Sequence, residues 1–316
     1  MIVALAGGVG GARLAVGLAA ALPPRALTIV VNTGDDFEHL GLAISPDLDT
    51  VMYKLAGIEN AQTGWGRAGE TWNCMDALAQ LGGETWFRLG DKDLAVHLLR
   101  TQALRQGKPL SEITRMLATQ LGIKHEIVPM SDSPVHTQVR TASGVLSFQD
   151  YFVRRQCRPR VRGFRFAGAR TAQVPPLLQK IIGSGKVKSV LICPSNPYVS
   201  VAPILSVPAI RAWIDARDFP VVAVSPIVGN VALKGPAAKM MRELGSEASA
   251  LGIARHYGGR VDGWVIDRQD ARLAHAIENT GRSVLVTDTV MSNRARSTRL
   301  AKKVVDFAQA LARRSK

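Results

Sequence analysis

Short runs of branched apolar residues recur along the chain, and stretches with helical periodicity separate them. Residues 2–6 form the first run; a glycine turn follows, then an Ala/Leu-rich helix that we expect to end at Pro23 and Pro24. Strands that are apolar on both faces are typical of a sheet covered by helices on both sides. The pattern therefore predicts a doubly wound α/β fold with a mostly parallel sheet. The further expected strands are residues 27–31, 187–193, 221–224, 263–266 and 283–286.

The middle of the chain departs from this alternation. Residues 70–121 are mainly helical in pattern, with Leu94, Leu98, Leu99 and Ala103 at helical spacing, and we interpret about 58–124 as a helical insertion. Shorter alternating stretches over residues 126–166 predict a small β excursion. An amphipathic helix over residues 294–313 closes the chain. We expect one α/β domain spanning residues 1–316, although this length would also allow two.

Composition limits the cellular setting. With 47% hydrophobic residues, the chain can bury a sizeable core. It has no charge-free run of 18 apolar residues, and its N-terminal apolar stretch contains glycines and Arg13, unlike a secretory signal. Cys74, Cys157 and Cys193 are an odd number without CxxC spacing, which argues against a disulfide framework or a zinc site. We therefore expect a cytoplasmic protein without a membrane partner.

The formal net charge is +15, from 40 Lys and Arg against 25 Asp and Glu. Such a surface attracts polyanions. Aromatic residues make up only 5% of the chain and do not interleave with the basic stretches, so nucleic acid is not the expected partner. A solvated basic face is the simpler interpretation of two concentrations of charge. These are the C-terminal tail from Arg294 and the acid-free stretch with Arg154, Arg155, Arg158, Arg160, Arg162, Arg165 and Arg170.

A glycine turn follows the first expected strand. Gly7, Gly8, Gly10 and Gly11 would let backbone N–H groups approach a phosphate at the N-terminus of the next helix. Gly8 and Gly10 match the start of the dinucleotide fingerprint, but Arg13 stands where its third glycine would be, and no GK[ST] follows. The turn predicts either a phosphate-binding loop or only a tight structural turn.

Acidic residues follow the second expected strand. Asp35, Asp36, Asp47 and Asp49 lie near one edge of the expected sheet, and their hard oxygen atoms suit Mg²⁺ held together with substrate phosphates. Asp47 or Asp49 could instead cap the helix that begins near them. Capping alone would leave Asp35 and Asp36 repelling each other, which favours metal or substrate binding. For Asp91, in a third acidic loop, capping and function are equally open.

Two further loops follow buried strands and carry hydrogen-bond donors. Ser195 and Asn196 come after the strand at 187–193, and Gly229 and Lys234 come after the strand at 221–224. Ligands of open α/β sheets bind at the carboxyl ends of the strands. We therefore expect these loops to hold a nucleotide together with the glycine turn.

Six blocks of sequence run in order from near the N-terminus to residue 237. They are LAGGVGGARLA (5–15), VNTGDDFEHLGLAISPDLDTVMYKLAG (31–57), RLGDKDLAVHLLRT (88–101), MSDSPVHT (130–137), CPSNPYVSVAPIL (193–205) and SPIVGNVALKGPA (225–237). Together they resemble the 2-phospho-L-lactate transferase family of coenzyme F420 biosynthesis. The main departure is Asn230, where many relatives would have glycine.

The resemblance implies a Rossmann-like fold, a homodimer and dependence on Mg²⁺. It also implies a reaction in which the terminal ribityl hydroxyl of the deazaflavin Fo attacks a guanosine-diphospho-activated acid and displaces GMP. Because this is phosphoryl-group transfer, positioning and charge neutralisation supply most of the catalysis. The sequence leaves open whether the acid is of the 2-phospholactate, phosphoenolpyruvate or 3-phosphoglycerate type.

Site residues follow from the resemblance one position at a time. Asp49, in the DLDT block, resembles the family's aspartate that contacts Fo on the metal side, and we expect it to orient or deprotonate the attacking hydroxyl. Arg88 matches the second position at the Fo site. The candidate ligands of Mg²⁺ or its water shell are Asp35, Asp36, Asp49 and Asp91. The residues expected around the nucleotide and its phosphates are Gly8, Gly10, Gly11, Ser195, Asn196, Gly229 and Lys234.

Two other classes of function are compatible with parts of the sequence. An NAD(P)-dependent oxidoreductase would share the opening strand, turn and helix, but the fingerprint is incomplete and an Asp-rich loop replaces the single ribose-binding acid. A basic nucleic-acid-binding protein would explain the charge, but no recognisable binding motif accompanies it. The transferase is therefore the favoured hypothesis.

Overall fold

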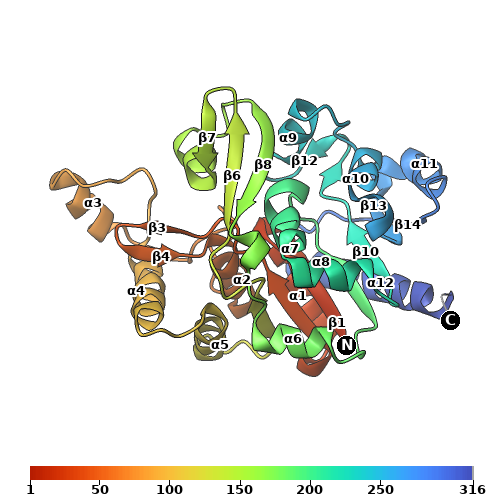
Figure 1. Ribbon diagram of the computed structural model, residues 1–316, viewed down its shortest axis with the longest axis horizontal. Helices are drawn as coiled ribbons and strands as arrows, with labels where there is room; N and C mark the ends of the chain where they lie inside the picture. The colour runs from red at the N-terminus through yellow and green to blue at the C-terminus, as the bar shows by residue number, and fades with distance from the viewer. Residues whose placement is uncertain (315–316) are drawn as a thin grey trace.

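The computed structural model describes residues 1–314, so Lys316 of the basic tail lies outside the described residues. A seven-stranded parallel sheet forms its centre, in the order β14-β13-β10-β9-β1-β2-β5 (Figure 1). Counted along the chain, this order is 7-6-5-4-1-2-3, which is that of a doubly wound Rossmann-like sheet. The predicted fold class is confirmed. The strands are β1 (Ile2–Ala6), β2 (Leu27–Val31), β5 (Glu126–Pro129), β9 (Ser189–Ile192), β10 (Val221–Val224), β13 (Gly263–Asp267) and β14 (Ser283–Thr287).

Each central strand contributes to two hydrophobic cores, because alternate side chains of a strand point to opposite faces. In β1, Val3 and Leu5 belong to one core, and Ala4 and Ala6 belong to the other. The core with Ala4 is covered by α1 (Gly8–Ala21), α2 (Pro46–Ala56), α4 (Asp91–Arg105), α5 (Leu110–Gln120) and α12 (Arg294–Arg314). The core with Val3 is covered by α6 (Pro176–Ile182), α7 (Ala202–Ser206), α8 (Pro208–Asp215), α9 (Ala237–Glu243), α10 (Ala250–Tyr257) and α11 (Ala274–Glu278).

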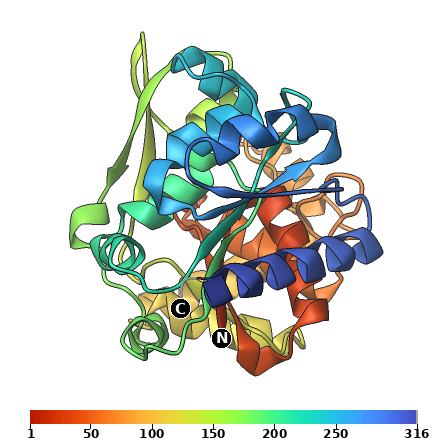
Figure 2. The same cartoon turned by 90° about the vertical axis from the view of Figure 1, so that its right-hand side faces the viewer.

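The C-terminal helix packs directly against the first helix of the chain. Figure 2 shows α12 crossing α1, and the two helices touch. Their backbones approach so closely at Gly17 that a Cβ atom there would collide with the carbonyl group of Ser297. The chain end thereby covers the helix that carries the glycine turn.

The β excursion begins later than predicted. β5 joins the central sheet beside β2, so the small antiparallel sheet comprises β6 (His136–Thr141), β7 (Gly144–Ser147) and β8 (Val161–Ala167), in the order β7-β6-β8. A four-residue apolar strand does not reveal from its sequence which sheet it joins. Two hairpins were not predicted: β3 (Phe37–His39) with β4 (Leu42–Ile44), and β11 (Ile227–Val228) with β12 (Val231–Ala232).

Residues between α2 and β5 form α3 (Asn73–Gln80), α4 and α5, as the helical pattern predicts. In α4, however, the buried face is not the one that carries the leucines. Leu98 and Leu99 are 57% and 50% exposed, whereas His97 and Arg100 are each 1% exposed. The spacing predicted the helix, and the tertiary structure buried its polar face.

Among residues 1–314, no single helix is both long enough and apolar enough to cross a membrane. On length and composition alone, a pair of segments that meet at 91°, Pro197–Ser206 and Pro208–Asp215, passes the same test.

Candidate active site

A cavity of about 610 Å³ lies at the carboxyl ends of β1 and β9. The sheet order reverses between these two strands, and this position is where open α/β sheets bind ligands. Loops from distant parts of the sequence meet there. The predicted site residues that line the cavity are Gly8, Gly10, Asp35, Asp49, Arg88, Ser195, Asn196 and Lys234.

The glycine turn packs tightly against the loop that follows β9. A Cβ atom on Gly10 would collide with the carbonyl oxygen of Pro194, and one on Gly11 would collide with the hydroxyl of Ser195. Ser195 also donates a hydrogen bond to the carbonyl oxygen of Gly7 at 2.8 Å. The glycines therefore allow the turn and the loop after β9 to meet at the cavity. Gly11 itself does not line the cavity.

The side chain of Asp47, from the first turn of α2, binds at the N-terminus of α1. Its Oδ1 accepts a hydrogen bond of 2.6 Å from the backbone N–H of Gly8, whose φ of +60° suits glycine. Its Oδ2 accepts a hydrogen bond of 2.9 Å from Asn32. Neither Asp47 nor Asp49 caps its own helix, because the cap of α2 receives no side-chain hydrogen bond. The hypothesis that they cap α2 is therefore wrong.

Asp35 and Asp47 form a buried carboxylate pair. The Asn32 amide that binds Asp47 also donates a hydrogen bond of 2.9 Å to Asp35 Oδ1. Burial raises the pKa of Asp47 to about 6. Burial and the neighbouring Asp47 raise the pKa of Asp35 well above its ordinary value. Two carboxylates that share one amide donor repel each other, and a cation between them would relieve this repulsion.

Asp36 has a different hydrogen-bond partner from this pair. It accepts a hydrogen bond of 2.7 Å from Ser45, and burial raises the pKa of its carboxyl group. Its other oxygen, Oδ1, is buried without a hydrogen-bond partner among the described residues. Asp36 lines a smaller cavity of about 280 Å³, which shares Asp35, Phe148 and Gln149 with the larger one.

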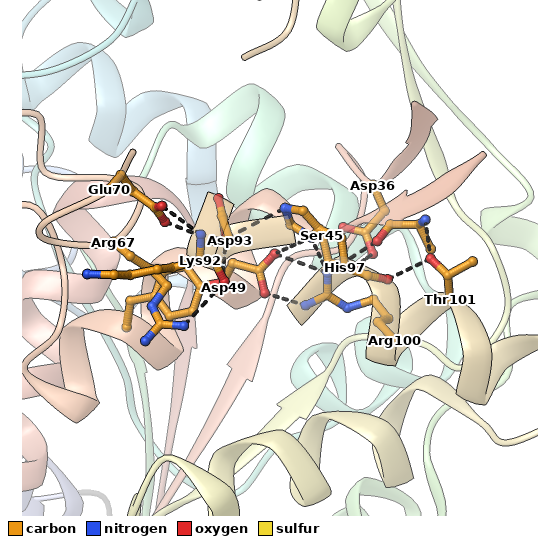
Figure 3. Close-up of polar contacts among 12 residues, drawn as sticks. Asp36, Ser45, Asp49, Arg67, Glu70, Lys92, Asp93, His97, Arg100 and Thr101 are labelled. Atoms are coloured by element: carbon orange, nitrogen blue, oxygen red, sulfur yellow. Dashed lines mark hydrogen bonds and ion pairs between the residues drawn. The ribbon is translucent and has the colours of Figure 1, made fainter. Parts of the chain in front are cut away.

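Asp49 is held by Arg100 of α4, and His97 of the same helix lies beside it (Figure 3). The guanidinium group of Arg100 donates to both carboxylate oxygens of Asp49, at 3.1 Å for Nη1 to Oδ2. Arg100 also donates towards Nδ1 of His97, 3.2 Å away, so the proton of a neutral His97 ring lies on Nε2. This Nε2 faces Asp93 at 3.6 Å, and Asp93 accepts a hydrogen bond from Tyr53.

Besides Gly11 and Asp36, two more predicted site residues lie outside the lining of the larger cavity. Asp91 is half-buried and accepts hydrogen bonds from the backbone N–H groups of Asn73 and Cys74, so it caps α3. The Thr71 hydroxyl also donates to it, and these hydrogen bonds lower the pKa of Asp91. Gly229 donates its N–H to Asp270 at 3.1 Å. The structure therefore does not bring Asp91 or Gly229 to the cavity surface.

The β11–β12 hairpin, which precedes Lys234, has a two-residue turn. Gly229 and Asn230 both have positive φ, +56° and +66°, between the paired residues Val228 and Val231. Hairpin turns of this kind favour glycine and asparagine. This geometry explains why glycine is expected at position 230 and why asparagine can replace it.

Cationic and aromatic side chains complete the cavity. Arg13 and Lys234 line it, and neither takes part in an ion pair among residues 1–314. Arg88 stacks on Trp72 at 4.4 Å and lies 3.9 Å from the exposed Asp76. The aromatic residues that line the cavity are Tyr53, Trp65, Phe87, Phe148 and Phe152.

Several polar residues of the site were not predicted from the sequence. Arg13 was noted only as a departure from the fingerprint and from a secretory signal. Asp47 was counted in the acidic cluster but was not named among the candidate Mg²⁺ ligands. Asp93, His97 and Arg100 were not assigned, although their i, i+4 and i+7 spacing places them on one face of a helix. Polar residues at this spacing, next to two leucines, were the available signal.

Two groups of side chains could hold a cation. Asp49, Asp93 and His97 offer three ligand atoms that lie within 4.8 Å of one another. This group already has counter-charges, because Arg100 pairs with Asp49 and Tyr53 donates to Asp93. Asp35 and Asp47 offer only hard oxygen atoms, face the cavity and lack a cationic partner among the described residues. The second group fits Mg²⁺ better.

Comparisons with known proteins agree along the whole chain. The family model described as 2-phospho-L-lactate transferase CofD matches residues 2–305. The chain is 40% identical over 314 residues to a protein of Streptomyces griseus subsp. griseus named phosphoenolpyruvate transferase, and the match covers 98% of both chains. It is 38% identical over 304 residues to a protein of Methanosarcina mazei named 2-phospho-L-lactate transferase. That match covers 96% of this chain and 99% of the relative.

Among solved structures, the fold is similar to that of a UPF0052 family protein from Bacillus halodurans. The TM-score is 0.64, and the match covers 96% of this chain and 98% of that one. With 15% sequence identity, this likeness supports the fold alone.

Proposed function

The chain belongs to the 2-phospho-L-lactate transferase family, and on this premise we propose which groups it joins and where each of them binds. As a member, it is a phospho-acid transferase of coenzyme F420 biosynthesis. We propose that the terminal ribityl hydroxyl of Fo attacks the phosphorus that carries the acid in its guanosine-diphospho-activated form. The new bond joins Fo oxygen to phosphorus, the phosphorus–oxygen bond to GMP breaks, and the hydroxyl proton is lost.

One observation carries this proposal: the family's Fo-site residues and the glycine turn line a single cavity. Asp49 and Arg88 lie among the aromatic lining residues, which suit the planar deazaflavin ring. Gly8, Gly10 and Ser195 lie at the switch point of the sheet, where nucleotides bind in folds of this class. A cavity of about 610 Å³ is large enough for the reacting ends of both substrates.

The cations around the cavity suit a diphosphate. Arg13 in α1 and Lys234 in the segment between β12 and α9 both line the cavity, and both are without an ion-pair partner among the described residues. We propose that they bind the phosphates of the activated acid. The developing charge on the leaving GMP would then face fixed positive groups.

We place Mg²⁺ at Asp35 and Asp47. Their buried carboxylates face the cavity and are destabilised by burial and by each other, so a divalent cation would restore favourable electrostatics. When bound there, Mg²⁺ supplies positive charge to the transferring phosphoryl group. The protein's own part is to hold Asp35 and Asp47 together through the Asn32 amide and the Gly8 N–H.

The test is mass spectrometry of the products formed from Fo, Mg²⁺ and three guanosine-diphospho-activated acids, offered separately. We expect GMP and an Fo phosphodiester to appear in equal amounts with one preferred acid. EDTA should abolish the product, and added Mg²⁺ should restore it. If Fo is returned unchanged with all three acids by a well-folded protein, the proposed acceptor is wrong.

A further inference from the structure

We infer that Arg100 is a positioning residue for the acceptor site, because it fixes the carboxylate of Asp49 where the acceptor hydroxyl must bind. This inference rests on the proposed function. Arg100 does not line the cavity itself, so it acts through Asp49.

The contacts of Arg100 leave Asp49 little freedom. Arg100 is 1% exposed and donates to both carboxylate oxygens of Asp49, so it fixes the position and the rotation of the carboxylate plane. Its Nη1 also donates to the carbonyl oxygen of Ala43 at 3.3 Å. The guanidinium group therefore ties α2 to the β3–β4 hairpin beside the acidic cluster.

The orientation of α4 argues that packing alone does not explain Arg100. The helix exposes Leu98 and Leu99 and buries His97 and Arg100. Burying a guanidinium–carboxylate pair while leucines face solvent gives up hydrophobic stabilisation, and a well-packed apolar pair is often at least as stable. A helix with a purely structural role would be expected to bury its leucines.

The charge of Arg100 also limits repulsion within the acidic cluster. Arg100 pairs directly with Asp49, whereas Asp35 and Asp47 share only the neutral amide of Asn32. Arg100 thus gives Asp49 the counter-charge that the pair assigned to Mg²⁺ lacks.

The same helix offers a matched control. Arg105 carries the same charge on α4 and donates to Gly41 of the same hairpin at 3.1 Å, but it is exposed and has no hydrogen bond or ion pair with Asp49. A variant without Arg105 therefore loses one positive charge and one contact with the hairpin, but it keeps the hydrogen bonds between Arg100 and Asp49.

The experiment compares R100M, R100K and R105M with the wild-type protein in steady-state kinetics, with Fo and the activated acid varied separately. We expect R100M to lower kcat/KM for Fo about 100-fold, because misplacing a substrate-orienting group by about 1 Å has effects of this size. The kcat/KM of R100K for Fo should be about tenfold higher than that of R100M. The KM for the activated acid should stay within about threefold in both variants, and R105M should behave as wild type.

In R100M the carboxylate of Asp49 is left buried without its partner, and a second comparison uses variants that lack this carboxylate. D49N and D49N/R100M are compared with each other, and we expect kcat/KM for Fo to agree within about threefold if Arg100 acts through Asp49. This comparison decides the question even if R100M alone does not fold. A further loss of about tenfold or more in the double variant would overturn the inference.

Other results would also count against it. A folded R100M with wild-type kcat/KM for Fo would overturn the role of Arg100 alone, since wild-type transfer in the same assay upholds the proposed function. Increases of similar size in the KM for Fo and in the KM for the activated acid would show a general structural effect and overturn it too. A folded wild-type protein that does not use Fo would overturn both proposals.

Discussion

At the scale of single residues, four aspartates within positions 35–49 share one edge of the sheet, and each is balanced differently. Asp35 and Asp47 share the Asn32 amide, Asp36 accepts from Ser45, and Asp49 pairs with Arg100. Only the last pairing supplies a full counter-charge. Ionisation therefore costs free energy at Asp35, Asp36 and Asp47, and we place the metal at the two of these that line the larger cavity, Asp35 and Asp47.

Loss of the Asp49 carboxylate should affect stability as well as activity. In Asp49→Ala the buried guanidinium group of Arg100 would lose its partner, and breaking such a pair typically costs about 3–5 kcal/mol. We expect urea denaturation to show a loss of this order, and Asp49→Asn to lose less, because its amide oxygen can still accept from Arg100. Asp76→Ala, at an exposed ion pair, serves as the control and should change stability little. An unchanged midpoint for Asp49→Ala would contradict the buried pairing.

The metal-free protein should lose stability as the pH rises through the pKa of Asp47. Burial raises that pKa from 3.8 to about 6, so between these values the folded state binds more protons than the unfolded state. By linkage, the stability supplied by protonated Asp47 is present below about pH 4 and lost as the pH rises to about 6, with a size of roughly 3 kcal/mol. In EDTA, denaturation from pH 4 to 8 should show that Asp47→Asn gains stability relative to wild type as the pH rises. A constant difference between the two proteins would refute this.

At the scale of elements, the first strand–turn–helix unit joins the two halves of the cavity. The glycine turn was expected either to bind phosphate or to make a tight turn, and the structure shows the tight packing directly. The N–H of Gly8 already donates to Asp47, so an arriving phosphate meets a carboxylate at the N-terminus of α1. This arrangement is consistent with a nucleotide that binds together with a cation.

Gly10→Ala should disturb the site through the neighbouring loop. Its new methyl group would collide with the carbonyl oxygen of Pro194, so α1 and the loop after β9 must separate. We expect a loss of about 1–3 kcal/mol in the free energy of unfolding, together with weaker binding of GDP measured by calorimetry. Gly183→Ala, where the added atom makes an ordinary contact of 3.5 Å and φ is −77°, should leave both quantities unchanged. Equal effects of the two substitutions would contradict this explanation.

At the scale of the whole molecule, charge and fold serve different purposes. The net charge of +15 has no role in the sheet order, but it would attract the anionic substrate that we propose. The homodimer, the cytoplasmic location and the single domain implied at the outset stay predictions. Light scattering would test the first of them against the chain mass of 34.0 kDa.

The positive surface should raise the rate of encounter with the activated acid. Because salt screens long-range attraction, kcat/KM for that substrate should fall as ionic strength rises from about 0.01 to 0.15 M, while kcat stays nearly constant. Stopped-flow or initial-rate measurements at matched Mg²⁺ would show this. A kcat/KM that does not depend on ionic strength would exclude electrostatic steering.

Local pattern in the sequence determined the strands, the glycine turn and the acidic loops, because alternation, turn residues and strand ends depend on near neighbours. The family blocks identified the transferase, and the resemblance pointed to Asp49 and Arg88. The tertiary structure alone decided that β5 joins the central sheet, that Asp91 caps α3, and that α4 buries Arg100 against Asp49. These outcomes depend on partners 17 to 98 positions apart, from Asp91–Cys74 to Thr28–Glu126, and no local pattern specifies such pairings.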